Sequence, residues 1–284
     1  MKILSVTFLA ITIITTAYGQ TKPANYEADW RRVDSLFQQR GLTRSALDGV
    51  QRIYAKAKKE NNQPQLIKAL IYRINLQQNI QEKGIIEGIY DLEKETAASE
   101  EPVRSILRSI LAQNYWMYFQ QHRWQLYDRT TTRNFNKSDL ETWSAEDFHR
   151  RISELYLQSV RSETLLQQTK LEPFDALIIK GNVRYLRPTL FDLVAHRALE
   201  YFTSNERDVN KPAYAFEISD PKAFADAASF TAHRFVTMDS LSFLHKAIEL
   251  YQHIIAFHLK DQKPAAFIDA DINRLQFVNQ YGVA

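Results

Sequence analysis

The sequence predicts an all-α protein. From Tyr26 to the end of the chain, apolar residues recur every three or four positions, whereas a strand would alternate every second residue. Gly (7) and Pro (8) are scarce among the 284 residues, so few helix breakers interrupt the pattern. Hydrophobic residues make up 45% of the chain and charged residues 24%, which excludes a disordered chain. We therefore expect antiparallel helical hairpins around a common core.

Residues 1–19 have the pattern of a signal peptide. Lys2 precedes an uncharged, mostly apolar stretch over residues 3–16, and Ala17 and Gly19 provide the small residues of a cleavage site. The stretch is shorter than the roughly 20 residues of a membrane-spanning helix, although an uncleaved anchor is the alternative. We expect cleavage near Gly19, export to the periplasm or the extracellular space, and no membrane span after cleavage.

The first part of the mature chain predicts a series of helices separated by short breaks. Gly41 is suited to a left-handed cap at the end of the first helix, and Pro64 fits the first turn of the third. Glu100, Glu101 and Pro102 open the fifth, with acidic residues at its positive end. The predicted helices cover residues 26–40, 43–61, 64–81, 84–96 and 100–119.

The second part contains two polar loops, at residues 128–143 and 203–222. Ser144 and Asp147 resemble a capping box for the helix that follows the first loop. Helices are predicted at 148–160, 189–202, 224–235, 241–259 and 264–282, with a helical turn at 177–179. The last helix has an apolar stripe of Ile268, Ile272, Leu275 and Val278. We divide the chain into a signal peptide (1–19), a helical domain (20–202), a polar loop (203–222) and C-terminal hairpins (223–284).

A weak internal repeat connects two of the hairpins. Ser45, Leu47 and Tyr54 have the same spacing as Ser242, Leu244 and Tyr251, and in both places a proline-containing break and a second helix follow. This weak repeat favours a stack of helical hairpins of the tetratricopeptide type. The full Trp-Leu-Gly-Tyr signature of that repeat is absent from the sequence, so a non-repetitive bundle is the alternative.

Charge and motifs argue against several function classes. The net charge is +3 and no run of Lys or Arg exceeds two residues, so we expect no nucleic-acid partner. The chain contains no Cys, which excludes thiol nucleophiles, Cys-based zinc sites and internal thioesters. It also has no Gly-rich phosphate loop and no Gly-x-Ser-x-Gly elbow. We therefore expect a protein that is not an enzyme, with no catalytic residues and no cofactor.

Two sets of polar residues with helical spacing are nevertheless candidate sites. His245, Glu249 and His253 lie four residues apart and would share one face of a helix, as metal ligands must. We interpret them as the polar flank of an apolar stripe, with metal binding as the alternative. Asp192, His196 and Glu200 repeat this spacing, and a buried His with a carboxylate one turn away is usually a structural group.

A dense group of aromatic residues is a candidate partner-binding surface. Tyr115, Trp116, Phe119 and Trp124 follow one another closely in the fifth predicted helix and just beyond it. Aromatic residues dominate interface hot spots, so these four side chains are candidates for lining a peptide groove. The preferred interpretation is that they fill the core between helices.

Three segments resemble a known family. They are Gln-Leu-Ile-Lys-Ala-Leu-Ile-Tyr-Arg (65–73), Arg-Tyr-Leu-Arg-Pro-Thr-Leu-Phe-Asp-Leu-Val-Ala-His-Arg-Ala-Leu-Glu-Tyr-Phe (184–202) and Phe-Ile-Asp-Ala-Asp-Ile-Asn-Arg-Leu-Gln-Phe-Val (267–278). With the export signal, they resemble the N-terminal helical region of very large bacterial alpha-2-macroglobulin-like proteins, over roughly residues 26–280.

The resemblance implies a role in protease trapping, host defence or envelope upkeep. It implies that this chain is a non-catalytic helical segment of a longer endopeptidase inhibitor, with downstream macroglobulin domains or a protease as its partner. The inhibitory elements of that family, including the cysteine-dependent thioester, have no counterpart here, so no functional residue is transferred. The alternatives, in order, are a free-standing helical-repeat adaptor that binds a protein or peptide, and a small envelope metal protein using His245, Glu249 and His253.

Overall fold

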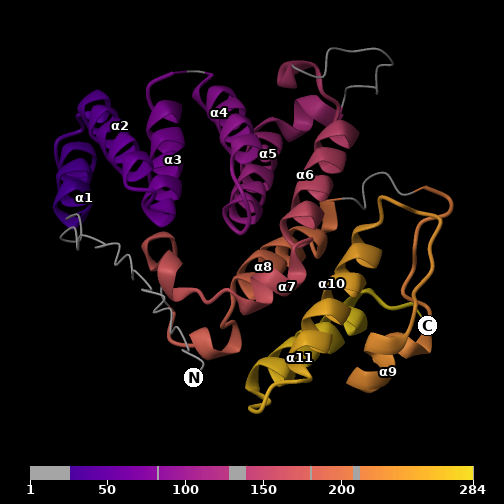
Figure 1. Cartoon of the computed structure of the whole chain (residues 1–284). Coiled ribbons are helices and arrows are strands. Elements are labelled where there is room, and N and C mark those ends of the chain that lie inside the picture. Colours follow the sequence, from indigo (N-terminus) through magenta and orange to yellow (C-terminus); the bar gives the residue numbers. More distant parts are fainter. Residues whose placement is uncertain (1–25, 82, 128–138, 180, 207–211, 284) are drawn as a thin grey trace, which may run out of the picture.

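The structure is a computed structural model that describes residues 26–81, 83–127, 139–179, 181–206 and 212–283. These residues form helices joined by short connections, with two isolated β-bridges and no strand among them (Figure 1). The all-α prediction is therefore confirmed. The predicted signal peptide lies outside the described residues.

The N-terminal helices begin and end close to the predicted positions. Helix α1 (Tyr26–Asp34) continues into a π-helical turn, η1 (Ser35–Gln39), and the chain reverses at Gly41, whose φ of +66° is left-handed. Helix α2 (Thr43–Lys59) is followed by α3 (Gln63–Gln78). The side chain of Asn62 accepts a hydrogen bond from the backbone N–H of Gln65, which caps one free donor at the start of α3.

The central hairpins are built from three helices, of which α5 (Val103–Tyr127) is the longest. They are α4 (Gly84–Ala98), α5 and α6 (Ala145–Ser159), and a short 3₁₀ turn, η2 (Leu140–Thr142), precedes α6. Ser144 and Asp147 exchange hydrogen bonds with each other's backbone N–H groups. The predicted capping box is therefore present at the start of α6, with Asp in the place usually taken by Glu.

The C-terminal part contains shorter helices packed around α8 and α10. A second capping box, between Thr189 and Asp192, begins α8 (Leu190–Phe202). The N-cap of α10 is Ser242, whose hydroxyl accepts from the N–H of His245. The elements are α7 (Glu163–Gln168), η3 (Glu172–Leu177), η4 (Arg184–Leu186), α8, η6 (Pro221–Phe224), α9 (Ala227–Ala232), α10 (Phe243–His258) and α11 (Ala265–Tyr281).

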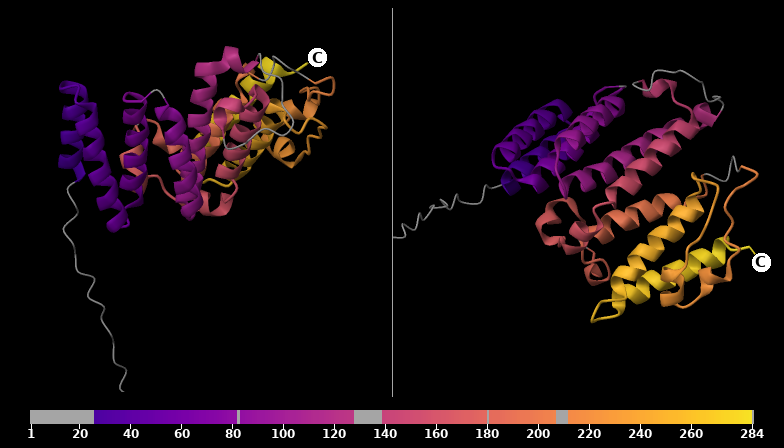
Figure 2. Two further views of the ribbon diagram at one scale, coloured as in Figure 1. Left: turned by 90° about the horizontal axis from the view of Figure 1, so that it is seen from above. Right: turned by 45° about the vertical axis from the view of Figure 1, so that its right-hand side comes forward.

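The helices form a curved row with a second group against one end. Helices α1 to α6 each pack on the next, and α8 packs on α5 and α6 (Figures 1 and 2). Helix α10 packs on α8, α9 and α11. The turn η3 returns to pack on α3, which is far away in the sequence. A simple repeat stack has contacts between neighbouring repeats alone, so this return departs from the expected repeat architecture.

The internal repeat seen in the sequence does not correspond to equivalent structural positions. Ser242 is the N-cap of α10, whereas Ser45 lies inside α2, which begins at Thr43. Tyr251 is buried and Tyr54 is half-buried. The two matched segments therefore enter their helices in different registers.

The prediction of a long helix over residues 224–235 is wrong. The α-helix there is α9, which covers Ala227–Ala232 alone. The side-chain amide of Gln252 donates to the carbonyls of Phe230 and His233, at distances of 2.7 and 2.6 Å. A side chain from α10 thus satisfies carbonyl groups that the next helical turn would otherwise have bonded, and the helix ends early.

The apolar stripe predicted for the last helix does not face the core. Ile268, Ile272 and Leu275 are 47, 49 and 37% exposed, and of the four stripe residues Val278 is buried. The inward face of α11 carries Arg274, whose side chain is 1% exposed and donates to the carbonyl of Ala223 at 2.6 Å. Its guanidinium also lies 4.6 Å from the ring centre of Phe230. Arg274 finds hydrogen-bond and aromatic partners inside, and this rotates the apolar residues outward.

Within the described residues, no helix is both long enough and apolar enough to cross a membrane.

Candidate functional site: an apolar groove between α3, α5, η3 and α8

An apolar groove of about 550 Å³ lies where η3 returns to the first helices. This volume is within the range of roughly 300–1,000 Å³ that is usual for ligand pockets. One wall comes from α3 and a second from α5, and the other two come from the segment 174–179 and from α8. Its apolar lining residues are Ile71, Ile74, Ile106, Ile110, Met117, Phe174, Leu177, Ile178, Ile179, Leu193 and Val194.

The polar lining residues of this groove are Asn75, Ser109, Gln113, Asn114 and Arg197, of which Ser109 and Asn114 are buried. Asn75 and Gln113 are exposed, and Arg197 on α8 is half-buried. Arg197 donates from Nε to the hydroxyl of Ser109 at 2.8 Å and from Nη2 to Oε1 of Gln113 at 2.5 Å. These bonds fix the guanidinium at the rim without neutralising it, because both partners are uncharged. Among the described lining residues, Arg197 alone carries a charge.

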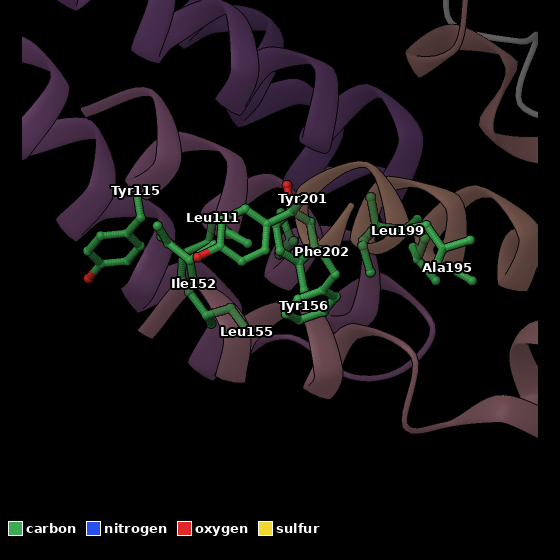
Figure 3. Packing of buried hydrophobic residues seen from close by; sticks show 14 of the residues in the cluster. Leu111, Tyr115, Ile152, Leu155, Tyr156, Ala195, Leu199, Tyr201 and Phe202 are labelled. Atoms are coloured by element: carbon green, nitrogen blue, oxygen red, sulfur yellow. The ribbon is translucent and has the colours of Figure 1, made fainter. Parts of the chain in front are cut away.

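The aromatic residues singled out in the sequence lie elsewhere. Tyr115 and Phe119 are 1 and 0% exposed, so they belong to the core and cannot line a groove. Trp116 is half-buried, stacks on Phe119 at 5.3 Å and meets the ring of Tyr201 edge-on at 5.2 Å. Figure 3 shows Tyr156 of α6 beside Tyr201 and Phe202 of α8. These rings hold α5, α6 and α8 together.

Trp124 differs from the other three aromatic candidates. It is 77% exposed near the end of α5, and the guanidinium of Arg123 lies 5.2 Å from its ring centre. Trp124 does not line the apolar groove. It is a single exposed aromatic residue, which by itself does not make a binding surface.

Of the three candidate metal ligands on α10, His245 and Glu249 pair with each other, and His253 pairs with Glu163. Nε2 of His245 lies 2.9 Å from the carbonyl of Phe235, and its Nδ1 lies 3.4 Å from Glu249. His253 lies 3.0 Å from Glu163 of α7. Hydrogen bonding to Glu249 and to Glu163 raises the pKa of His245 and of His253, against the opposing effect of burial. In the part of the chain that the structure describes, no group of three or more His, Asp or Glu residues is arranged to hold a metal ion.

Asp192 belongs to a buried cluster that sequence spacing did not reveal. Its carboxylate accepts from Thr189 at the start of α8 and lies 2.8 Å from Nε2 of His258 on α10. The other ring nitrogen of His258 lies 2.7 Å from Asp261. Burial lowers the pKa of His258, but the hydrogen bonds and charges of Asp192 and Asp261 raise it more, and the net pKa is raised. Both ring nitrogens of His258 thus face carboxylates, an arrangement that favours the imidazolium form.

His196 lies one turn after Asp192 but has a different environment. Its Nδ1 lies 2.9 Å from the backbone carbonyl of Asp192, not from the carboxylate. Burial and the nearby positive charge of Arg187 lower the pKa of His196. Glu200, on the next turn, is exposed. The three residues therefore form a structural arrangement on α8 and do not converge on a common reacting position.

The groove residues were missed in the sequence for an identifiable reason. Helix α5 has apolar residues on more than one face, because Ile106, Ile110 and Met117 lie on a different face from Leu107 and Leu111. An all-round apolar helix indicates burial on two sides. The run Leu177-Ile178-Ile179 in polar surroundings is a second signal. Neither signal shows that the two segments meet, which depends on the return of η3 to α3.

The chain matches no protein-family model, no curated protein and no solved structure. The likeness to macroglobulin-type proteins thus depends on the three sequence segments alone. In the structure these segments lie in α3, in η4 with α8, and in α11, where most of their apolar residues pack against neighbouring helices.

Proposed function

We propose that this protein is a non-catalytic helical binding module whose groove between α3, α5, η3 and α8 accepts a segment of a partner protein. The observation that supports the proposal is the groove itself, with its long apolar lining and a single charged group, Arg197, at the rim. Peptide-binding proteins commonly combine an apolar surface for anchor side chains with a few polar groups that set orientation.

The chemistry of the groove defines the partner. Apolar side chains of the partner would replace solvent on Ile110, Leu193 and Met117. A carboxylate of the partner would lie against Arg197, which has no acidic partner among the described residues. Arginine suits this contact because its planar guanidinium binds carboxylates through two parallel hydrogen bonds. The expected occupant is a peptide with two or three apolar residues and one adjacent acidic group.

Selection from a displayed library of random peptides tests this function. The mature chain is immobilised, and peptides that bind are expected to be enriched in apolar residues with an adjacent Asp or Glu. Their affinity should fall about tenfold or more in Arg197→Gln, because a charge-assisted hydrogen bond is lost. Glutamine keeps a donor for Ser109, so the fold should be retained. Arg52→Gln on α2, away from the groove, is the matched control.

The proposal fails if no peptide is enriched, or if the enriched peptides bind Arg197→Gln and wild type equally. Binding of small apolar molecules without any peptide binding would also contradict it.

A second candidate function follows from the exposed stripe of α11. Ile268, Ile272 and Leu275 lie on successive turns and are all exposed, and contiguous apolar surface of this kind marks an interaction site. We propose that a β-rich macroglobulin-type domain covers the stripe, with this chain as the helical arm of an exported protease inhibitor.

Sequencing the source DNA beyond codon 284 tests the second candidate. An open frame that runs into β-rich domains supports it, and a thiol introduced as Ile272→Cys should then be protected from a thiol reagent in the longer product. A stop codon directly after Ala284, with no β-rich domain downstream, would contradict it.

A further inference from the structure

A second, chemically different pocket lies on the opposite side of α5 from the groove. It has a volume of about 250 Å³ and is bounded by the C-terminal part of α4, the first turns of α5 and the second half of α6. Arg104, Arg108 and Leu111 line it and are spaced three and four residues apart on one face of α5. The groove residues Ser109, Ile110 and Gln113 lie on the other face. The two sites are therefore independent.

Three arginines converge on this pocket. They are Arg104 and Arg108 of α5 and Arg151 of α6. Burial lowers the pKa of the Arg108 guanidinium, and the positive charges of Arg104 and Arg161 lower it further, against the opposing effect of Glu101. The N-terminal end of α5, which begins at Val103, adds the positive end of a helix dipole to the same region.

Two of the three arginines, Arg108 and Arg151, already pair with nearby carboxylates. Glu101 lies 3.1 Å from Arg108 and also accepts from both the N–H and the hydroxyl of Ser105. Glu93 lies 2.9 Å from Arg151 and accepts from the hydroxyl of Tyr115 at 2.7 Å. Arg104 uses its Nε for the carbonyl of Ser99, and this backbone partner leaves its charge uncompensated.

A buried hydroxyl without a hydrogen-bond partner belongs to a residue that lines the same pocket. Thr96 of α4 lines it and is 8% exposed, and its hydroxyl oxygen is buried without a hydrogen-bond partner. A buried hydroxyl that makes no hydrogen bond is costly, and such groups in folded proteins usually contact a water or an ion. A threonine hydroxyl can donate a hydrogen bond to an anion.

We propose that this pocket binds a small oxyanion, a phosphate or carboxylate group, through Arg104, Arg108, Arg151 and the hydroxyl of Thr96. Guanidinium groups match the geometry of both anions, and a pocket of about 250 Å³ has space for one such group with its immediate substituent. Phosphate and carboxylate ligands share this chemistry, and separate titrations with the two anions distinguish them.

Titration of the mature chain with inorganic phosphate, and separately with acetate, tests the site. Potassium chloride keeps the ionic strength constant, and binding is followed by calorimetry and by the thermal midpoint. Saturable binding of phosphate or acetate is expected, and the tighter of the two identifies the natural chemistry. Arg104→Gln should weaken binding about tenfold or more by removing a charge-assisted contact. Thr96→Val should weaken binding and leave the thermal midpoint without ligand unchanged or higher.

Arg150→Gln is the matched control, because Arg150 neighbours Arg151 on α6, pairs with Glu146 at 2.7 Å and does not line the pocket. Its affinity for the anion should equal that of wild type. The proposal is overturned if neither anion saturates, or if Arg150→Gln loses as much affinity as Arg104→Gln. Peptide binding in the groove should be the same in Arg104→Gln and wild type, so the two sites can fail separately.

Discussion

The cluster of Asp192, His258 and Asp261 makes the stability of the fold depend on pH. The side chains of His258 and Asp192 are 1 and 0% exposed, and they join α10 to the start of α8. The net pKa of His258 is raised, because the two carboxylates outweigh the effect of burial. A raised pKa means that the folded state holds the proton more tightly than the unfolded chain does.

The raised pKa of His258 sets the direction in which stability changes with pH. The stabilisation from His258 is complete below the pKa of an unfolded histidine, about 6.5, and is lost as the pH rises through the higher pKa of the folded state. The free energy of unfolding should therefore fall as the pH rises above neutrality. His245 and His253, whose pKa values are also raised, act in the same direction, whereas His196 acts in the opposite one.

A substitution isolates the contribution of His258. In His258→Ala the Asp192 carboxylate stays buried without its cationic partner, and breaking a buried pair in this way costs about 3–5 kcal/mol. His253→Ala is the matched control on the same helix. The side chain of His253 is 56% exposed, so its pair with Glu163 should contribute less than about 1 kcal/mol.

Urea unfolding between pH 6 and pH 9 measures both effects. The wild type should lose stability with rising pH, and His258→Ala should show a smaller loss over the same range. The reasoning is refuted if His258→Ala destabilises the protein no more than His253→Ala, or if the pH dependence of His258→Ala equals that of wild type.

Three further substitutions test the packing. Trp116→Ala should lower the free energy of unfolding by about 3–5 kcal/mol, because it leaves a cavity beside Phe119 and Tyr201. A decrease below about 1 kcal/mol in urea unfolding would show that the ring is dispensable. Arg274→Met should lower the free energy of unfolding by about 1–3 kcal/mol, because the carbonyl of Ala223 loses its hydrogen-bond donor. An unchanged urea midpoint would contradict a stabilising role for Arg274. Ser144→Ala should lower the free energy of unfolding by about 1 kcal/mol, because it removes the N-cap of α6. The thermal midpoint should fall accordingly, and a gain in stability would exclude a stabilising cap.

Local sequence signals predicted most of the helices. Gly41, Pro64 and the Ser144–Asp147 pair act within one turn of their own positions, and the structure has a chain reversal or a helix start at each of them. The short helix α7 was missed, and the helical turn predicted at 177–179 lies earlier in the chain, in η3, because a stretch of six residues has too few turns to show a period.

The orientation of α11 could not be predicted from periodicity. Its apolar residues form a regular stripe, but Arg274 takes the inward position by bonding to Ala223 and packing on Phe230, both distant in the sequence. A hydrophobic pattern places charged residues at the surface and apolar residues in the core. In α11 the partners of Arg274 allow it to be buried, so the apolar stripe faces outward instead. The early end of α9 has the same origin, because Gln252 of α10 caps it.

The candidate sites depend even more on contacts between distant segments. The groove requires η3 to meet α3. The pocket lined by Arg104, Arg108 and Arg151 requires α4, α5 and α6 to pack together. The candidates taken from spacing were all on single helices, where His245 and His253 turned out to have separate partners. Spacing shows which residues share a helix face, but it does not show which faces meet.

Occupancy of the groove by a peptide is the measurement that tests the central claim most directly. The chain has no cysteine, so Met117→Cys places a single thiol in the groove, where Met117 is 36% exposed. Met238→Cys, at a residue that is 83% exposed and does not line the groove, is the control. A selected peptide with apolar residues and an acidic group should slow thiol labelling at position 117 and leave labelling at position 238 unchanged. Equal labelling of Met117→Cys with and without a saturating amount of the peptide would contradict the assignment of the groove as the binding site.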